Sequence, residues 1–295
     1  MKTKKYLQIA FSSLILFVLA LSACKKDRVV QDDYQSMDSF YNQYKEEEQE
    51  YVIDSSGSCP LVCKKGTKLC ASADLLQFSG GTGVTYPFTL KVVELYSIKE
   101  MLLWRAPATA GGGILETSAE IRVRPFKNGT EVELKPNKTY YMEMDTMPNL
   151  QSSMQMFYGH DSNGIIDWSN SGSSVSVNSY FYILNVGETG WVSSARPHTS
   201  TAQNTTITIT AAGTNTQNIE IYLTFANFKG LMKITNLVSG SVPIGEQVKL
   251  FAMAKNQNND YVLDQQTFTV TGNQQITLNM QVVSEASLLA ALDAL

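Results

Sequence analysis

The stretch IEIYLTF, residues 219–225, alternates apolar side chains with polar or aromatic ones. A period of two places successive side chains on opposite faces of an extended chain, so this stretch predicts a β-strand with one buried face. The predicted inward side chains are Ile219, Ile221, Leu223 and Phe225, and the predicted outward ones are Glu220, Tyr222 and Thr224. We therefore expect an antiparallel sheet with one covered face.

The same alternation recurs in short runs along the chain. The runs are PFTLKVVEL at 87–95, EIRVRPF at 120–126, TTITIT at 205–210, QVKLFAMA at 247–254 and ITLNMQV at 276–282. Asn128-Gly129 separates two alternating runs, and it predicts a tight hairpin because both residues tolerate positive φ. Short alternating strands are typical of a β-sandwich rather than of a helix-covered parallel sheet. The sequence therefore predicts a mainly β protein.

The β pattern is interrupted once, which suggests two domains. We predict two β-sandwich-like domains, over residues 58–145 and 146–283, because a polar stretch rich in serine, asparagine and glycine separates the two sets of strands. The first domain also holds one predicted helical turn, in YSIKEMLLW at 96–104. A short helix is expected over 284–295, capped by Ser284, because leucines recur there at helical spacing.

Residues 1–23 have the layout of a secretory signal peptide. Basic residues precede an apolar run of about 15 residues that ends at Leu21, and a transmembrane helix would need about 20. Leu21-Ser22-Ala23-Cys24 then resembles a bacterial lipobox. That resemblance implies cleavage before Cys24, acylation of its thiol and of the new amino terminus, and a lipid bilayer as partner. The alternative is an ordinary signal peptide with an incidental cysteine.

Residues 24–57 differ in composition from everything that follows them. QDDYQSMDSFYNQYKEEEQEY, residues 31–51, is acidic and holds no glycine or proline. Its tyrosines recur near helical spacing, but the apolar stripe is thin. We therefore predict an acidic tether, partly helical at best, that spaces the body from the lipid. The alternative is a helix that binds a partner.

Five longer segments follow one another between residues 64 and 254. They are KKGTKL, YPFTLKVVELYSIKEMLL, GGGILETSAEIRV, YFYILNVGETGWVSSARP and VPIGEQVKLFAMA. Together with the junction SACKKD at 22–27, they resemble an uncharacterised family of Bacteroidota outer-membrane and surface lipoproteins. The resemblance implies a first domain distantly similar to ZU5-type sandwiches, a second similar to transthyretin-like ones, and no particular activity. It also implies a place in the outer membrane facing outside, with the periplasmic face as the alternative.

That family has a Gly-Trp pair to which Gly190-Trp191 corresponds. In the family a cysteine and an acid follow the pair, whereas Val192 and the residues after it supply neither here. A site built on that cysteine and acid is therefore not expected in this chain.

Charge and cysteine content limit which partners, disulfides and metal sites are expected. The formal charge is −4, and removal of residues 1–23 takes away three lysines and no acid, so nucleic acid is not an expected partner. Three further cysteines, Cys59, Cys63 and Cys70, lie in one short segment. Export permits disulfides, so one pair and one remaining thiol are expected among them. A zinc site would need a fourth ligand, and no histidine lies nearby in the sequence.

The stretch GHDSNGIIDW holds the best small group of residues that could bind a metal ion. Asp161, Asn163 and Asp167 carry oxygen atoms at spacings that a calcium loop could use, although the closing bidentate glutamate is missing. A plain turn rich in asparagine and aspartate explains the same residues. Trp168 and Trp191 could line a carbohydrate platform or fill the core of a sandwich.

The sequence lacks the motifs of common catalytic sites. It holds two histidines, His160 and His198, and no G-x-S-x-G elbow, H-E-x-x-H pair, P-loop or dinucleotide-binding glycine pattern. We therefore predict no cofactor and a non-enzymatic binding or structural module at the cell envelope, with a glycan or a protein as partner. The first alternative is a fimbrial or adhesin subunit. The second is a secreted carbohydrate-active enzyme that uses two facing carboxylates.

Overall fold

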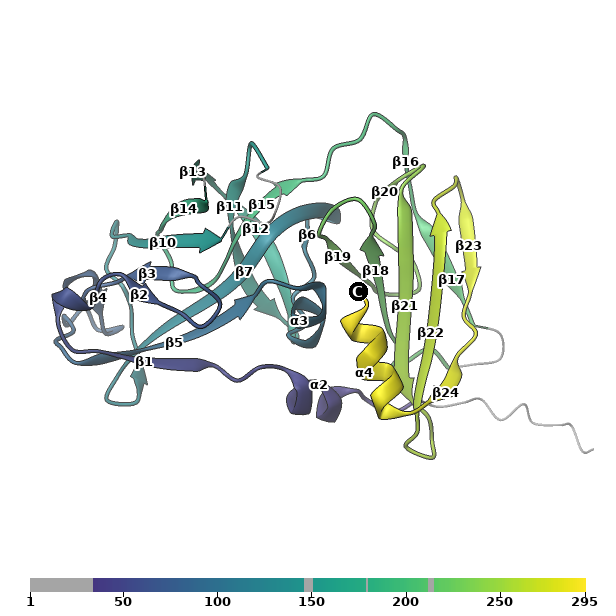
Figure 1. Cartoon of the computed structure of the whole chain (residues 1–295), viewed down its shortest axis with the longest axis horizontal. Helices are drawn as coiled ribbons and strands as arrows, with labels where there is room; N and C mark the ends of the chain where they lie inside the picture. The colour runs from purple at the N-terminus through teal and green to yellow at the C-terminus, as the bar shows by residue number, and fades with distance from the viewer. Residues whose placement is uncertain (1–33, 146–150, 179, 212–214) are drawn as a thin grey trace, which may run out of the picture.

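The computed structural model describes residues 34–145, 151–178, 180–211 and 215–295 (Figure 1). The predicted signal peptide and the predicted lipidation site, Cys24, lie outside these residues. Within the described ranges, no helix combines the length and the apolar character that crossing a membrane requires.

The described chain is mainly β, as predicted, with several antiparallel sheets and a short carboxy-terminal helix. Its eight-stranded sheet has the order β1-β5-β7-β15-β11-β12, and β6 and β8 also pair with β7. The bounds are β1 (Gln49–Ile53), β5 (Phe88–Leu95), β6 (Thr109–Ala110), β7 (Gly113–Lys127), β8 (Thr130–Glu131), β11 (Gln155–Ser162), β12 (Ile165–Ser174) and β15 (Gly190–Pro197). All its pairs are antiparallel.

A five-stranded sheet covers one face of this sheet (Figure 1). Its order is β13-β14-β10-β3-β2, with bounds β2 (Leu61–Val62), β3 (Lys68–Cys70), β10 (Tyr140–Asp145), β13 (Ser176–Val177) and β14 (Phe181–Val186). The connections hold η1 (Ser56–Ser58), η2 (Ala73–Leu75) and the small pair β4 (Leu76–Gln77) and β9 (Glu133–Leu134). An apolar core fills the space between the two sheets, and the alternating side chains of β5 and β7 contribute Leu90, Val92, Ile121 and Val123 to it.

Asn128-Gly129 turns the chain between β7 and β8, as predicted. Asn128 has a φ of 50° and Gly129 a φ of 79°, and Lys127 pairs with Thr130. A two-residue loop with positive φ at both positions matches the twist of the strands that flank it. The predicted hairpin is therefore confirmed.

The chain does not divide at Asp145 as predicted, because strands on both sides of this residue share sheets. β10 pairs with β14, and β7 pairs with β15. The first half of the molecule therefore extends from β1 through β15, to Pro197. The serines and asparagines that suggested a domain boundary lie mostly exposed on β12, at the edge of the sheet. Polar composition here marks an edge strand.

The second half is built on a five-stranded antiparallel sheet in the order β19-β18-β21-β22-β24. The bounds are β18 (Glu220–Phe225), β19 (Leu231–Ile234), β21 (Gln247–Lys255), β22 (Tyr261–Thr269) and β24 (Gln281–Val283). Two small pairs lie against one face: β16 (Asn204–Thr205) with β20 (Val242–Pro243), and β17 (Ile207–Thr210) with β23 (Gln274–Thr277). Ile221, Leu223 and Phe225 face the core between them, as predicted. The pair β17–β23 is parallel, which the sequence did not predict.

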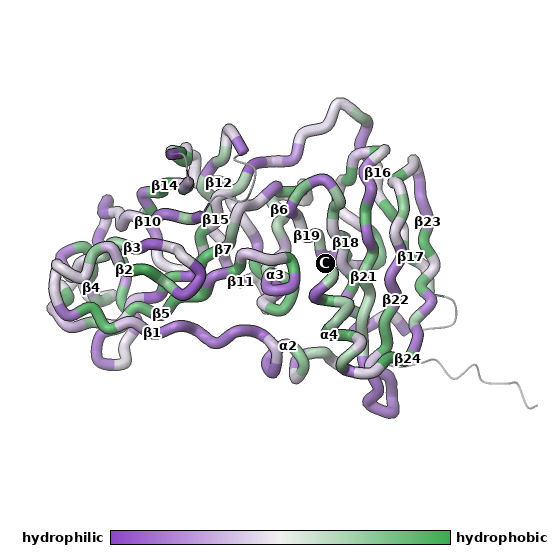
Figure 2. The backbone as a smooth tube through the Cα atoms, viewed as in Figure 1, coloured by the Kyte–Doolittle hydropathy of each residue, from purple (hydrophilic) through white to green (hydrophobic). Residues whose placement is uncertain are grey.

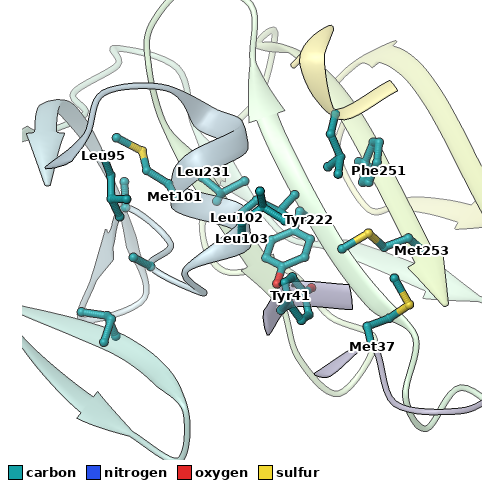
Figure 3. Packing of buried hydrophobic residues seen from close by; sticks show 14 of the residues in the cluster. Met37, Tyr41, Leu95, Met101, Leu102, Leu103, Tyr222, Leu231, Phe251 and Met253 are labelled. Atoms are coloured by element: carbon teal, nitrogen blue, oxygen red, sulfur yellow. Dashed lines mark hydrogen bonds between the residues drawn. The ribbon is translucent and has the colours of Figure 1, made fainter. Parts of the chain in front are cut away.

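A central core joins the two halves (Figure 3). It contains the helices α2 (Asp38–Tyr44), α3 (Ile98–Leu103) and α4 (Glu285–Asp293). Tyr222, which was predicted to point outward, is fully buried in this core, and its hydroxyl oxygen lies 3.1 Å from that of Tyr41. The prediction was wrong because the helices cover the face of β18 that alternation alone would leave to solvent.

Residues 34–53, predicted as part of a solvated tether, instead form a strap that is packed along both halves (Figure 1). Gln35 forms a β-bridge with Lys255 of the second half, and β1 pairs with β5 of the first. Between these contacts, α2 buries Phe40 and Tyr41 in the central core. The connection from α2 to β1 is hydrophilic (Figure 2), which gave the segment the composition of a tether. The few aromatic side chains of α2 are therefore enough to hold the strap against the central core.

The carboxy-terminal helix lies where it was predicted. The Ser284 hydroxyl accepts a hydrogen bond of 3.1 Å from the backbone N–H of Ser287, which caps α4. Leu288 and Leu292 are buried in the central core. The predicted cap and apolar face of this helix are therefore confirmed.

Candidate functional site

A cavity of about 750 Å³ opens beside the strap, where α2 and the end of α3 meet the eight-stranded sheet. Its wall includes the tryptophans Trp104 and Trp191 and the basic side chains of Lys45, Arg105 and Arg122. Small ligands commonly occupy cavities of about 300–1,000 Å³ that combine aromatic side chains with a few polar groups. We call this cavity the strap cavity, and it is the candidate site.

The register of the strands sets the tryptophans side by side. Trp168 on β12 and Trp191 on β15 both pair with Gly159 on β11, and Trp191 also pairs with Arg122 on β7. Directly opposed residues of antiparallel strands point to the same face. The Trp168 and Trp191 rings meet edge to face, with centroids 6.5 Å apart. Trp104, which follows α3 directly, meets Trp191 in the same way at 5.7 Å.

Gly159 provides the space in which these rings meet. A Cβ atom at this position would lie 2.6 Å from Cγ2 of Ile166, 2.9 Å from Cβ of Trp191 and 3.0 Å from Cζ3 of Trp168. A side chain here would therefore have to displace closely packed neighbours. Glycine fixes the positions of both tryptophans beneath the strap cavity.

Two cations of the wall are neutralised by carboxylates. Arg105 forms an ion pair with Asp38, and its Nη2 atom also lies 3.5 Å from Oε1 of Glu220. Arg124 pairs with Glu131 through an Nη2–Oε2 contact of 2.5 Å. Hydrogen bonding from Arg124 holds the pKa of Glu131 below its usual value. Asp38, Glu220 and Glu131 are therefore ion-pair partners of arginines.

Lys45 and Arg122 lie beside Trp104, and neither is hydrogen-bonded to a carboxylate. Nζ of Lys45 lies 5.0 Å from the ring centroid of Trp104, and Cζ of Arg122 lies 5.9 Å from that centroid and 5.7 Å from the centroid of Trp191. Neither side chain forms a hydrogen bond to another residue of the described chain. The ion-pair contact of Arg122 is a distance of 3.5 Å to Glu48. The wall therefore offers a ligand two cationic donors beside an aromatic ring.

The predicted calcium residues do not converge on one point. Asp167 pairs with His160, the chain neighbour of Asp161, and successive strand positions point to opposite faces, so the two carboxylates lie on opposite faces of the hairpin. Asp161 lines the strap cavity, and its Oδ1 accepts a hydrogen bond of 2.8 Å from the Gly164 N–H. Asn163, with a φ of 56°, lies in the turn. Groups of three or more histidine, cysteine or acidic side chains suited to a metal do not occur among the described residues.

The cysteine segment forms one disulfide, between Cys59 and Cys70, whose Cα atoms are 4.9 Å apart. Cys63 is a buried free thiol, and burial raises its pKa to about 12. A thiol with so high a pKa is protonated and unreactive at neutral pH. All three cysteines lie away from the wall of the strap cavity, so their part is structural.

The two histidines lie in different places. His160 lines the strap cavity, whereas His198 lies where the two halves meet. Nδ1 of His198 is 2.7 Å from Oε1 of Glu116 in the first half, and its ring stacks on Phe228 of the second at 4.1 Å. The histidines therefore cannot act as a pair.

Comparison of the chain with protein-family models, with curated proteins and with solved structures gave no match. The resemblance to surface lipoproteins therefore stays a prediction. The sequence had singled out Trp191 and Asp161, which both line the strap cavity. It had missed Trp104, Arg122 and Lys45, which come from three separate elements.

Proposed function

We propose that this protein is a lipid-anchored binding module of the outer membrane, facing outside, and that its strap cavity holds a glycan. The anchor in this proposal is the acylated Cys24, for which the lipobox is the support. The binding role is supported by the chemistry of the cavity wall. The module works without a cofactor.

The observation that supports a glycan as the ligand is the position of the half-buried Trp104 among polar side chains. A sugar ring has an apolar face of C–H groups and a rim of hydroxyls, so it is held by an aromatic ring together with polar groups. The strap cavity supplies this combination with Trp104, the Lys45 and Arg122 donors, and Asn42 of the strap.

The engaged carboxylates support binding rather than catalysis. Hydrolysis of a glycoside needs one carboxyl group as an acid and a second as a nucleophile or base. In the strap cavity, Asp38 and Glu131 are held in ion pairs with arginines. Asp161 accepts a backbone hydrogen bond from Gly164. Each acid therefore has a structural partner already.

Trp104→Ala is expected to weaken glycan binding by up to about tenfold, since an aromatic contact contributes about 0.5–1.5 kcal/mol. The full-length protein in detergent is first applied to a glycan array, and the affinity of wild type and variant for a retained glycan is then compared. Tyr180→Ala is the control, because Tyr180 is an exposed aromatic residue outside the strap cavity. Retention of no glycan, or equal binding by wild type and Trp104→Ala, contradicts the proposal.

Cys24→Ala is expected to abolish labelling by an alkyne fatty acid and to release the protein from the membrane fraction, because two or more acyl chains are needed for stable anchoring. Proteinase K added to intact cells should digest the wild type while a periplasmic control protein survives. Equal labelling of the variant removes the anchor from the proposal. Full protection in intact cells places the protein on the inner leaflet.

Two other results would support one of the alternative functions instead of the proposed one. Polymers on native gels would support a fimbrial subunit. Products released from a polysaccharide would support a carbohydrate-active enzyme.

A further inference from the structure

We infer that the glycan in the strap cavity is acidic and that its carboxylate binds Arg122 and Lys45. This class of ligand deepens the proposed function and rests on it. The acids of the wall are engaged by Arg105, by Arg124 or by backbone N–H groups, whereas Arg122 and Lys45 form no hydrogen bond within the described chain. The charged donors that remain for a ligand are therefore Arg122 and Lys45.

Arg122 is already held where a ligand would meet it. Its guanidinium carbon lies within 6 Å of the ring centroids of both Trp104 and Trp191, and its side chain is 28% exposed. Contact with aromatic faces stabilises a guanidinium without using its N–H groups. A planar carboxylate can accept two of those N–H groups at once. The structure thus presents a preorganised fork for such a group.

The like charge of Arg124 also favours an anion beside Arg122. Arg124 lies two residues along β7 and so points to the same face. Burial, and then the like charge of Arg124, lowers the pKa of Arg122. Glu48 lies 3.5 Å from Arg122 and 3.3 Å from Arg124, and Arg124 also pairs with Glu131. The contact of Arg122 with Glu48 is a long ion pair without a hydrogen bond, so the N–H groups of Arg122 stay open to a ligand carboxylate.

Lys45 approaches Trp104 from the strap. It follows α2 directly, and its ammonium nitrogen lies over the indole ring. Its four-carbon stem is flexible, so the ammonium group can move from the ring to a ligand carboxylate. That movement uncovers the indole face for the sugar ring. Lys45 therefore couples recognition of the acid to stacking of the sugar.

The test compares acidic oligosaccharides with their carboxyl-reduced forms. Uronate oligomers, hyaluronan fragments and sialyllactose are each titrated, with and without reduction, into the full-length protein in detergent by calorimetry. At least one acidic probe is expected to bind about tenfold or more tightly than its reduced form, as charge-assisted hydrogen bonds warrant. Arg122→Met should bring the acidic probe to the affinity of the reduced one. Lys45→Met should cause a smaller loss.

Arg196→Met is the matched control. The Arg196 side chain is 29% exposed, close to the value for Arg122, but it pairs with Glu116 outside the strap cavity. This control should bind like wild type. If Arg122→Met does not fold, Lys45→Met on the strap tests whether the protein binds the carboxylate of the ligand.

The outcomes separate the inference from the proposed function. Equal binding of acidic and reduced probes, or binding of neutral glycans alone through Trp104, overturns the acidic ligand and leaves the glycan-binding module standing. Binding of no probe and of no array glycan overturns both. Equal loss in Arg122→Met and Arg196→Met also overturns the role assigned to Arg122.

Discussion

Replacing Phe40 with alanine is expected to lower the free energy of unfolding by about 3–5 kcal/mol, the usual cost of removing a buried phenylalanine ring. Phe40 lies in α2 of the strap and is 1% exposed. Its ring centroid is 4.8 Å from that of Tyr44 and 5.4 Å from that of Tyr261 in the second half. The cavity left by this substitution would be enclosed on several sides.

Urea denaturation of the full-length protein in detergent measures the difference in the free energy of unfolding between wild type and Phe40→Ala. Val52→Ala is the matched control on the same strap, because Val52 is 69% exposed and a surface substitution changes stability by about 0.5 kcal/mol or less. A strap that is docked gives a large effect for Phe40 and a small one for Val52. If both variants unfold like wild type, the segment is the solvated tether that the composition suggested.

Glu120→Gln is expected to make the protein more stable at neutral pH and to flatten the dependence of its stability on pH. Both carboxyl oxygens of Glu120 are buried without a hydrogen-bond partner in the described part of the chain. Burial raises the pKa of this carboxyl group well above its usual value of 4.5, and the charge of Lys229 opposes the rise less strongly. The folded protein therefore keeps a proton that the unfolded chain loses.

The sign of the pH effect follows from that proton. Above about pH 4.5 the unfolded chain gains free energy by ionising Glu120, so the stability of the wild type falls as pH rises toward the folded pKa, by up to about 1.4 kcal/mol per pH unit. Glutamine keeps the shape of the side chain and does not titrate. Urea denaturation between about pH 5 and pH 8 should show the two curves moving apart. Parallel curves would mean that Glu120 ionises equally in both states.

Local sequence signals predicted the parts of the fold that local contacts decide. The Asn128-Gly129 hairpin depends on the φ values of two adjacent residues, and the cap of α4 depends on Ser284 and its own helix. Both are confirmed. The burial of Tyr222 depends instead on helices far away in the sequence. A period of two shows which side chains share a face, but not whether another element covers that face.

The candidate site was harder to predict for the same reason. Arg122 and Trp191 are placed together by the pairing of β7 with β15, and Trp104 arrives from the end of α3. No fixed spacing in the sequence predicts that residues of these separate elements lie together. One signal was present, since Arg122 and Arg124 alternate with the buried Ile121 and Val123 on a strand. A pair of arginines on one face of a strand can point to a ligand as well as to solvent.

Quenching of tryptophan fluorescence by acrylamide, with and without a bound glycan, tests directly whether the strap cavity is the binding site. The chain holds three tryptophans, and they form one row in which Trp168 and Trp191 are buried and Trp104 is half-buried. Acrylamide should therefore reach Trp104 most easily in the free protein. A saturating glycan should shield that residue and lower the quenching constant toward the value of Trp104→Ala. Saturable binding with an unchanged quenching constant would place the glycan outside the strap cavity and contradict its role as the binding site.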